Sequence, residues 1–190
     1  MDPHAVLPEA FCARPCEEVA RDLVGRWLVR DEVVLRITET EAYCGPDDSA
    51  AHTRMGRTAR NAPMWGPPGR AYVYLCYGLH WMLNVVTGAP LGSAVLIRAA
   101  EPIAGLATIR ARRGGKDGPV LLTGPGKVGA ALALDASLSH HPLHEPGGLV
   151  LAHGTPAEAL LAGPRVGIDY ATPVDRAATR RFALAGSGSV

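Results

Sequence analysis

The segment from residue 33 to residue 43 constrains the fold of this chain most, because its side chains alternate as a β-strand requires. If the strand stays regular, one face carries, in order, Val33, Leu35, Ile37, Glu39, Glu41 and Tyr43. A carboxylate on an apolar face costs free energy unless it is hydrogen-bonded or opens into a cleft. Glu41 is therefore the first candidate functional residue, since a charged side chain at a position where the strand pattern requires an apolar one indicates function.

Similar patterns predict the remaining elements. Helical spacing predicts helices over residues 17–24, 103–113 and 127–134. Runs rich in β-forming residues predict strands over residues 27–30, 71–77, 81–86, 94–98, 149–152 and 165–170. The first of these strands should pair with 33–43 through Asp31 and Glu32, and 71–77 should form a hairpin with 81–86. Residues 45–69, rich in Gly and Pro, predict a long ordered loop.

The length of 190 residues fits one globular domain with a substantial core. We expect that domain to span residues 17–184, after an N-terminal segment of residues 1–16. The Gly- and Ser-rich residues 185–190 predict a flexible tail.

Charge is distributed unevenly along the chain. Residues 49–100 contain no Asp or Glu, yet they carry Arg54, Arg57, Arg60, Arg70, Arg98, Tyr72, Tyr74 and Tyr77. Arginines hold phosphates and aromatic rings stack on bases, so this tract indicates a nucleic-acid partner although the net charge is only +1. The alternative is a hydrophobic sheet that uses Arg for solubility. Tyr77, expected beside a hairpin tip, is hard to bury and resembles a wedge between base pairs.

No feature of the sequence predicts a metal or another cofactor. The four cysteines, Cys12, Cys16, Cys44 and Cys76, lie far from the paired histidines His140 and His144, so a zinc site is not expected. We expect His140, His141 and His144 to lie in a solvent-exposed loop. No apolar run approaches the ~20 residues of a membrane span, and we expect a cytoplasmic protein with reduced thiols.

Two further motifs stay open at this level. His52 follows the predicted strand closely, and a lone histidine is either structural or catalytic. The segment Gly124-Pro125-Gly126-Lys127 lacks the Ser or Thr of a phosphate loop. It is either a plain helix start or the hairpin of a helix-hairpin-helix protein, in which Lys127 contacts phosphate.

The residues together resemble the alkyladenine (3-methyladenine) DNA glycosylase family over about residues 20–182. The resemblance is carried by residues 39–43, Ala50-Ala51-His52, Arg60-Asn61, the run 66–69 before Tyr72-Val73-Tyr74, Tyr77-Gly78, Asn84 and residues 95–102. It implies a mixed α/β fold, with a curved antiparallel sheet flanked by helices and a protruding hairpin that inserts into DNA. It also implies a base-excision repair enzyme that hydrolyses the N-glycosidic bond of alkylated or deaminated purines in double-stranded DNA. The protein would act as a monomer, associated with the nucleoid when bound to DNA.

The resemblance also implies a role for individual residues. Glu41 would deprotonate the attacking water, and Arg98 would hold that water and the nearby backbone. The pocket for the extruded purine would be lined by Tyr43, Ala51, His52, Tyr74 and Asn84, the last excluding certain purine substituents at the entrance.

On the DNA itself, the resemblance implies that Tyr77 fills the gap left in the duplex. Arg57 and Lys127 match family positions near phosphates. Three loop positions depart from the family pattern, namely Met55, Ala59 and Trp65. These departures affect the expected rigidity of the loop and the range of damaged bases that the protein would accept. The residues expected to carry out catalysis are all present.

Two alternatives are kept. A non-catalytic nucleic-acid-binding module would use the same basic tract without cutting, but has no reason to keep Glu41 beside phosphates. A helix-hairpin-helix glycosylase would need a catalytic Asp and Lys after Gly124. Only Lys116 and Lys127 are lysines, so strand cleavage through a lysine imine is disfavoured.

Overall fold

The strand expected from residue 33 to residue 43 is the centre of an antiparallel sheet. The computed structural model describes residues 2 and 4–188. In it, β2 (Val33–Tyr43) pairs along one edge with β5 (Ala94–Ala104), and its other edge is shared by β1 (Trp27–Arg30) and β8 (Arg181–Leu184). Nearly every residue of β2 is buried.

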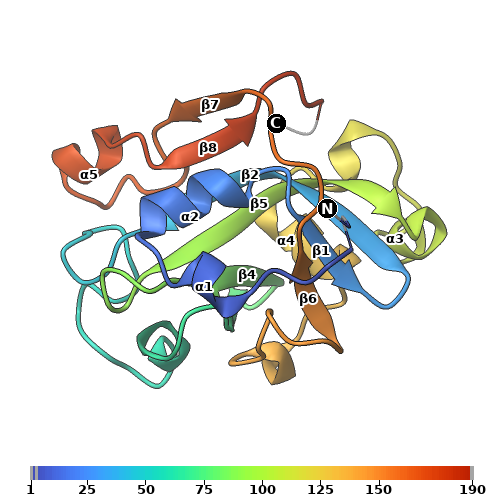
Figure 1. Ribbon diagram of the computed structural model, residues 1–190. Helices are drawn as coiled ribbons and strands as arrows, with labels where there is room; N and C mark the ends of the chain where they lie inside the picture. Colours follow the sequence, from blue (N-terminus) through green and yellow to red (C-terminus); the bar gives the residue numbers. More distant parts are fainter. Residues whose placement is uncertain (1, 3, 189–190) are drawn as a thin grey trace.

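The remaining strands extend this centre into a curled sheet (Figure 1). They are β3 (Ala71–Cys76), β4 (His80–Val86), β6 (Leu149–Ala152) and β7 (Leu160–Gly163). The strand order is β3-β4-β5-β2-β1-β6, and β7 joins the sheet through β8. The predicted mixed α/β fold with a curved antiparallel sheet is therefore confirmed.

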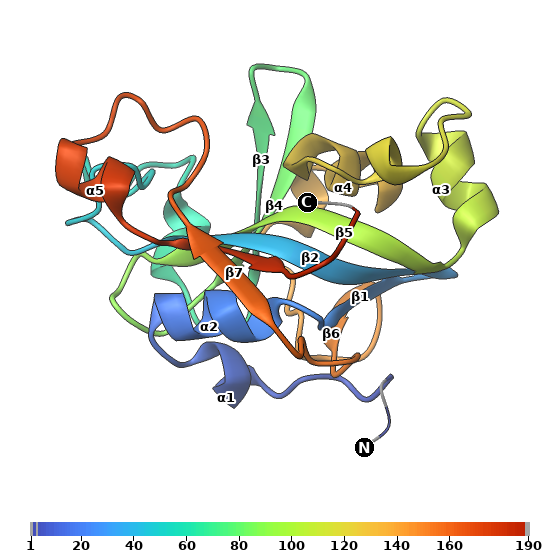
Figure 2. The ribbon, with the colours of Figure 1, turned by 90° about the horizontal axis from the view of Figure 1, so that it is seen from above.

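Short helices cover both faces of the sheet. They are α1 (Glu9–Cys12), α2 (Cys16–Leu23), α3 (Leu106–Arg112), α4 (Pro125–Ala131) and α5 (Pro173–Ala177). Figure 2 shows α1 and α2 on one face and α3 and α4 on the other, where the β3–β4 hairpin also projects. Three short 3-10 helices complete the described elements, at Ala62–Trp65, Pro119–Leu121 and Ala136–Leu138.

Helix α2 packs on the central strand because its sequence is amphipathic. Val19, Ala20 and Leu23 are buried, while the acids at its start suit a helix N-terminus. The Thr40 hydroxyl donates a hydrogen bond to the Ala20 carbonyl over 2.7 Å, so this side of β2 faces α2. The predicted helix at residues 17–24 is thus present, shifted by one residue.

The central strand is irregular at Glu39, which lies between Ile37 and Glu41 on the face predicted from the sequence. Pairing with β5 is irregular on both sides of Glu39. Ile37 and Ala42 both belong to the main core, although side chains five positions apart in a regular strand lie on opposite faces. Beyond the irregularity Thr40 and Ala42 face the core, so Glu41 does not simply continue the apolar face that contains Ile37.

Two other predicted elements differ from the structure. The helix expected at 103–113 begins only at Leu106, because β5 continues to Ala104 through its pairing with β2 and Gly105 separates the strand from the helix. Gly105 has φ of 75°, and a Cβ there would lie 2.6 Å from the Glu32 carbonyl oxygen. Residues 165–170 form a loop, not a strand, since the strand β7 ends before Pro164, which has no N–H to donate. Strands β7 and β8 were not predicted.

The glycine-rich start of α4 serves close packing against the hairpin. Pro125 occupies the first turn of the helix, where its missing N–H costs little. A Cβ on Gly129 would lie 2.0 Å from the Trp81 carbonyl oxygen, and one on Gly126 would lie 2.8 Å from His80. The glycines therefore let α4 approach the start of β4, next to the turn of the β3–β4 hairpin.

The two ends of the chain extend the sheet and the core. Leu7 and Cys12, in the segment before residue 17, are buried in the main core. At the other end the Ala185 amide donates to the Ala159 carbonyl. Residues 189–190 of the expected flexible tail lie outside the described residues, and its flexibility stays a prediction.

Candidate active site

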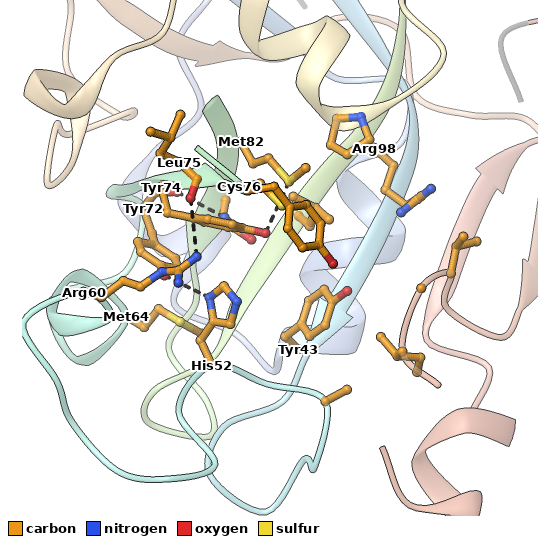
Figure 3. Close-up of a pocket in the computed structure, with 18 of the residues that line it drawn as sticks. Tyr43, His52, Arg60, Met64, Tyr72, Tyr74, Leu75, Cys76, Met82 and Arg98 are labelled. Carbon is orange, nitrogen blue, oxygen red and sulfur yellow. Dashed lines mark hydrogen bonds between the residues drawn. The ribbon is translucent and has the colours of Figure 1, made fainter. Parts of the chain in front are cut away.

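A cavity of about 630 Å³ opens between the β3–β4 hairpin, the loop after β2 and the loop before α5. Its wall includes the tyrosine rings of Tyr43, Tyr72 and Tyr74 together with His52 (Figure 3). Apolar and sulfur-containing side chains complete much of the remaining surface, among them Met64, Leu75, Cys76, Met82, Leu96 and Ile168. A concave, aromatic-lined site with a few polar groups is the expected form of a binding pocket for a flat ligand.

The hairpin supplies two of the rings in a fixed arrangement. The Tyr72 and Tyr74 rings are stacked with their centroids 5.3 Å apart, and the His52 ring meets Tyr74 edge-on at 4.7 Å. Both tyrosines lie on one face of β3, whereas Val73 between them is buried in the main core, as the alternation of side chains along a strand requires. Tyr72 was not among the predicted site residues.

His52 is held as a neutral side chain. Its Nδ1 lies 2.9 Å from the Tyr72 hydroxyl oxygen. Burial, followed by the nearby charges of Arg60 and Arg54, lowers the pKa of His52 to about 4. At neutral pH the imidazole is therefore uncharged, with one nitrogen that donates and one that accepts a hydrogen bond.

Glu41 does not reach the cavity surface. Its side chain is fully buried, with 0% exposure, so of the two alternatives that the sequence left open the carboxylate is hydrogen-bonded and does not open into the cleft. Oε1 accepts a hydrogen bond from the Val166 amide over 2.7 Å, and Oε2 accepts one from the Tyr43 hydroxyl over 2.9 Å. Arg98 Nη1 lies 3.4 Å from Oε2. These three partners all line the cavity, so the carboxylate lies one layer behind its wall.

Burial governs the ionisation of this group. Burial raises the pKa of Glu41 above its ordinary value, and Arg98, the Val166 amide and the Tyr43 hydroxyl oppose that rise. Burial and the adjacent Glu41 also raise the pKa of Tyr43, so its hydroxyl keeps its proton and donates to the carboxylate. A buried acid with a raised pKa beside an aromatic pocket is typical of a functional site.

Arg98 links the two acids of the central strand. Its Nε lies 3.5 Å from Glu39 Oε1, and its Nη1 approaches Glu41 as described. Nε has no hydrogen-bond partner, and the side chain is 17% exposed. Arg98 is also one of the residues that line the cavity.

The other predicted pocket residues are placed as follows. Asn84 is 5% exposed, lines the cavity, and donates from Nδ2 to the Tyr72 carbonyl over 3.2 Å. Ala51 is fully buried and is not part of the wall, where Ala50 stands instead, because the Ala51 amide turns back to bond the Asp48 carbonyl. The structure thus brings together Tyr43, His52, Tyr74, Asn84 and Arg98, but not Ala51.

The three residues that were predicted to meet DNA differ in their relation to the cavity, and only Tyr77 belongs to its lining. Tyr77, in the hairpin turn with φ of 50°, is 94% exposed and borders the cavity. Arg57 is exposed, whereas the Lys127 ammonium group donates to the Thr123 hydroxyl over 2.9 Å. Within the described part of the chain, Arg54, Arg57 and Arg60 form no ion pair, so their charges are not neutralised by the protein.

Sequence reasoning missed two residues on the opposite rim. Tyr170 lines the cavity, donates its hydroxyl to the Ala50 carbonyl over 2.9 Å, and lies under the Arg54 guanidinium at 5.2 Å. Val166, beside it in the wall, holds Glu41 through its amide. Their positions depend on long-range packing between the loop after β7 and the loop after β2, which no local sequence pattern signals.

The histidine cluster and the cysteines, for which no metal site was expected, are placed as follows. Within residues 2 and 4–188 no group of three His, Cys, Asp or Glu side chains could hold an ion. The loop of His140, His141 and His144 is less exposed than predicted. Only His140 is exposed, because His141 Nε2 bonds with the Leu149 carbonyl and His144 packs under Gly69. All four cysteines are free.

Comparison with known proteins defines the class. The family model described as methylpurine-DNA glycosylase (MPG) matches residues 10–188. A protein of Nitrosococcus oceani that bears the provisional name 3-methyladenine DNA glycosylase is 62% identical over 180 residues, covering 94% of this chain and 90% of that protein. The DNA-3-methyladenine glycosylase of Arabidopsis thaliana is 55% identical over 183 residues, covering 95% of this chain and 72% of its own length.

The chain belongs to the methylpurine-DNA glycosylase family, as its motifs predicted. Its class is therefore that of a DNA glycosylase, an N-glycosyl hydrolase of alkylation repair with DNA as its substrate. Among the described helices, none has the length and apolar character to cross a membrane.

Proposed function

We propose that this chain is a monofunctional glycosylase that swings a damaged purine out of duplex DNA into the aromatic cavity and hydrolyses its N-glycosidic bond, leaving an abasic site. The observation that carries the proposal is the Glu41–Arg98 pair, which lies directly behind a cavity walled by Tyr43, His52 and Tyr74. A base inside a duplex is inaccessible to such a site, so the enzyme must extrude it at a cost of a few kcal/mol.

The rim of the cavity supports the first step, in which the duplex is gripped. Arg54, Arg57 and Arg60 carry charges that no acid of the described chain pairs, which suits contacts with phosphates. Tyr77 stands on a rigid hairpin and exposes 94% of its surface. An exposed ring of this kind fills the space that the extruded nucleotide leaves between its neighbours.

The cavity wall supports the second step, in which the purine is held. The Tyr43 and Tyr74 rings and the neutral His52 offer π faces and a hydrogen-bonding edge to a flat base. A purine that carries a positive charge after methylation is favoured further by aromatic faces. Asn84, whose amide is fixed by the Tyr72 carbonyl, presents a rigid boundary that excludes some purine substituents.

The chemical step uses the acid behind the wall. As the bond from the purine nitrogen to C1′ breaks, its electrons leave with the base and the sugar acquires oxocarbenium character. Ionised Glu41 stabilises that charge and accepts a proton from the water whose oxygen bonds to C1′. Because the carboxylate is sealed, Oε2 must first exchange its contact with Tyr43 or Arg98 for one with water.

The reaction stops at the abasic site, because strand cleavage through an imine needs a lysine amine at the reacting sugar. No lysine lines the cavity of the described structure, and Lys127 is bonded to Thr123. We also propose that the protein acts on DNA as a monomer.

The decisive experiment is a base-release assay with the purified protein. Duplexes that contain 3-methyladenine, 7-methylguanine, hypoxanthine or ethenoadenine are incubated, and the free base is quantified alongside strand scission before and after alkali. We expect release of at least one damaged purine, with strand breaks only after alkali. The sealed carboxylate also suits a protein that binds DNA without cutting. Salt-sensitive binding with no free base from any duplex would establish that second function instead.

A further inference from the structure

A buried ion pair outside the predicted site lies behind the cavity wall. The Arg165 and Asp48 side chains are 0% and 1% exposed, and they meet through two parallel contacts, Nη1 to Oδ2 at 2.5 Å and Nη2 to Oδ1 at 2.9 Å. Burying two charges removes their hydration, and the attraction between them often does not compensate for that loss. Proteins in which such a pair is replaced by apolar residues are frequently just as stable. Stability alone is thus a weak reason for this pair, and its contacts indicate another.

Arg165 contacts the central strand between the two site residues. Its Nη1 donates to the Ala42 carbonyl over 2.8 Å, and Ala42 separates Glu41 from Tyr43. The guanidinium carbon lies 4.8 Å from the centroid of the Tyr43 ring. The next residue along the chain, Val166, donates its amide to Glu41 Oε1 over 2.7 Å. One side chain therefore fixes the strand, the ring and the loop that together hold Glu41.

Asp48 extends this connection to a third part of the wall. Its carboxylate accepts hydrogen bonds from the amides of Cys44, over 2.9 Å, and Ala50, over 3.0 Å. Ala50 lines the cavity two residues before His52. The pair thus joins two separate segments that line the same cavity, namely the end of β2 with the loop that follows it, and the loop that contains Val166.

We propose that Arg165, clamped by Asp48, is a positioning residue for the hydrolysis, setting the spacing of Glu41, the Tyr43 ring and the Val166 amide. This inference rests on the proposed function. Arg165 is sealed from solvent and its charge is balanced by Asp48, so it acts on geometry and not on the DNA itself. A displacement of about 1 Å in such a site is enough to cost roughly 10²-fold in rate.

The test uses two variants and a matched control. Arg165→Lys keeps the charge but loses the planar fork that contacts Asp48, Ala42 and the Tyr43 ring at once. Arg165→Met combined with Asp48→Asn removes both charges while an amide oxygen remains for the Ala50 amide. Arg180→Met is the control, because Arg180 pairs with Asp48, Asp175 and Glu17 but contacts neither Tyr43 nor Val166.

Three quantities are measured on folded protein, verified by circular dichroism at the assay temperature. They are the single-turnover rate of base release against pH, the Kd for lesion DNA, and the ¹⁵N shift of the Val166 amide against pH without DNA. We expect a rate lowered about 10- to 100-fold, a nearly unchanged Kd, and a Val166 titration moved to higher pH. The titration should move because a loosened amide bond favours the ionised Glu41 less.

A folded Arg165→Lys protein with the wild-type rate and an unmoved Val166 titration would overturn the inference, and so would equal losses in Arg180→Met. If the double variant does not fold, Arg165→Lys decides alone. Failure of the proposed function is recognised separately: wild-type protein then releases no base, while the Val166 titration, which needs no substrate, still reports whether Arg165 sets the geometry at Glu41.

Discussion

Replacing Tyr43 by Phe removes one hydroxyl group from the site and leaves the aromatic ring of the wall in place. That hydroxyl donates a 2.9 Å hydrogen bond to Oε2 of the buried Glu41 carboxylate. A hydrogen bond to a charged buried acceptor contributes about 1.5–3 kcal/mol. Without it the ionised form of Glu41 is less stable, so the pKa of Glu41, already raised by burial, rises further.

The consequence is visible in the pH dependence of the rate. If ionised Glu41 is the base, the rate of base release falls as the pH is lowered through the pKa of Glu41. This falling part of the pH–rate profile, its acid limb, should move to higher pH in Tyr43→Phe. A loss of about 1.5–3 kcal/mol corresponds to a rate roughly 10- to 100-fold lower on that limb. Well above the limb the rate should return to at least the wild-type value, because water gains access to Oε2.

The assay is single-turnover release of hypoxanthine from a duplex over a series of pH values, with the Kd measured in parallel. Tyr72→Phe is the matched control, since its hydroxyl contacts His52 and not Glu41. A Tyr43→Phe profile that superimposes on the wild-type profile would refute the reasoning. A rate lowered equally at every pH would show that the hydroxyl itself takes part in the chemistry.

Three further predictions concern stability and DNA contact. Glu41→Gln should raise the melting temperature at pH 7–8 by about 2–4 °C for each kcal/mol of burial cost relieved. The pKa of Glu41 is raised in the folded protein, so the protonated acid stabilises the fold. That stabilisation is complete below the ordinary pKa of a glutamate and is lost as the pH rises through the pKa of the folded state. The gain should therefore vanish at acid pH, and a lower melting temperature at pH 8 would contradict the sign. Arg57→Ala should reduce the slope of log Kd against log salt by about 1, whereas Arg21→Ala on the opposite face should not. Gly129→Ala should destabilise the fold by about 1–3 kcal/mol in denaturant melts, since its Cβ would lie 2.0 Å from the Trp81 carbonyl, and Gly188→Ala, in open space, should change nothing.

Local patterns were sufficient for the elements whose partners follow directly in the chain. The pairing of β1 with β2 and of β3 with β4 came from alternation interrupted by turns, and both hairpins have the predicted partners. Such predictions succeed because period and turn chemistry are properties of a short segment.

Features set by distant segments were missed. The helix expected from residue 103 is strand up to Ala104, because Arg36 and Glu101 pair across β2 and β5, with Nη1 and Oε1 3.0 Å apart. Glu41 is sealed by Val166, which is 125 positions further along the chain. The Arg165–Asp48 clamp spans 117 positions. A single sequence carries no local signal for contacts of this kind.

The central claim is that ionised Glu41 removes the proton from the attacking water, and one substitution tests it most directly. Glu41→Gln keeps the size of the side chain and an oxygen for the Val166 amide but has no basic carboxylate. The account predicts that single-turnover base release falls about 10²–10⁴-fold while lesion DNA is still bound, and that Glu39→Gln loses far less. Full release activity in a folded Glu41→Gln protein would contradict it.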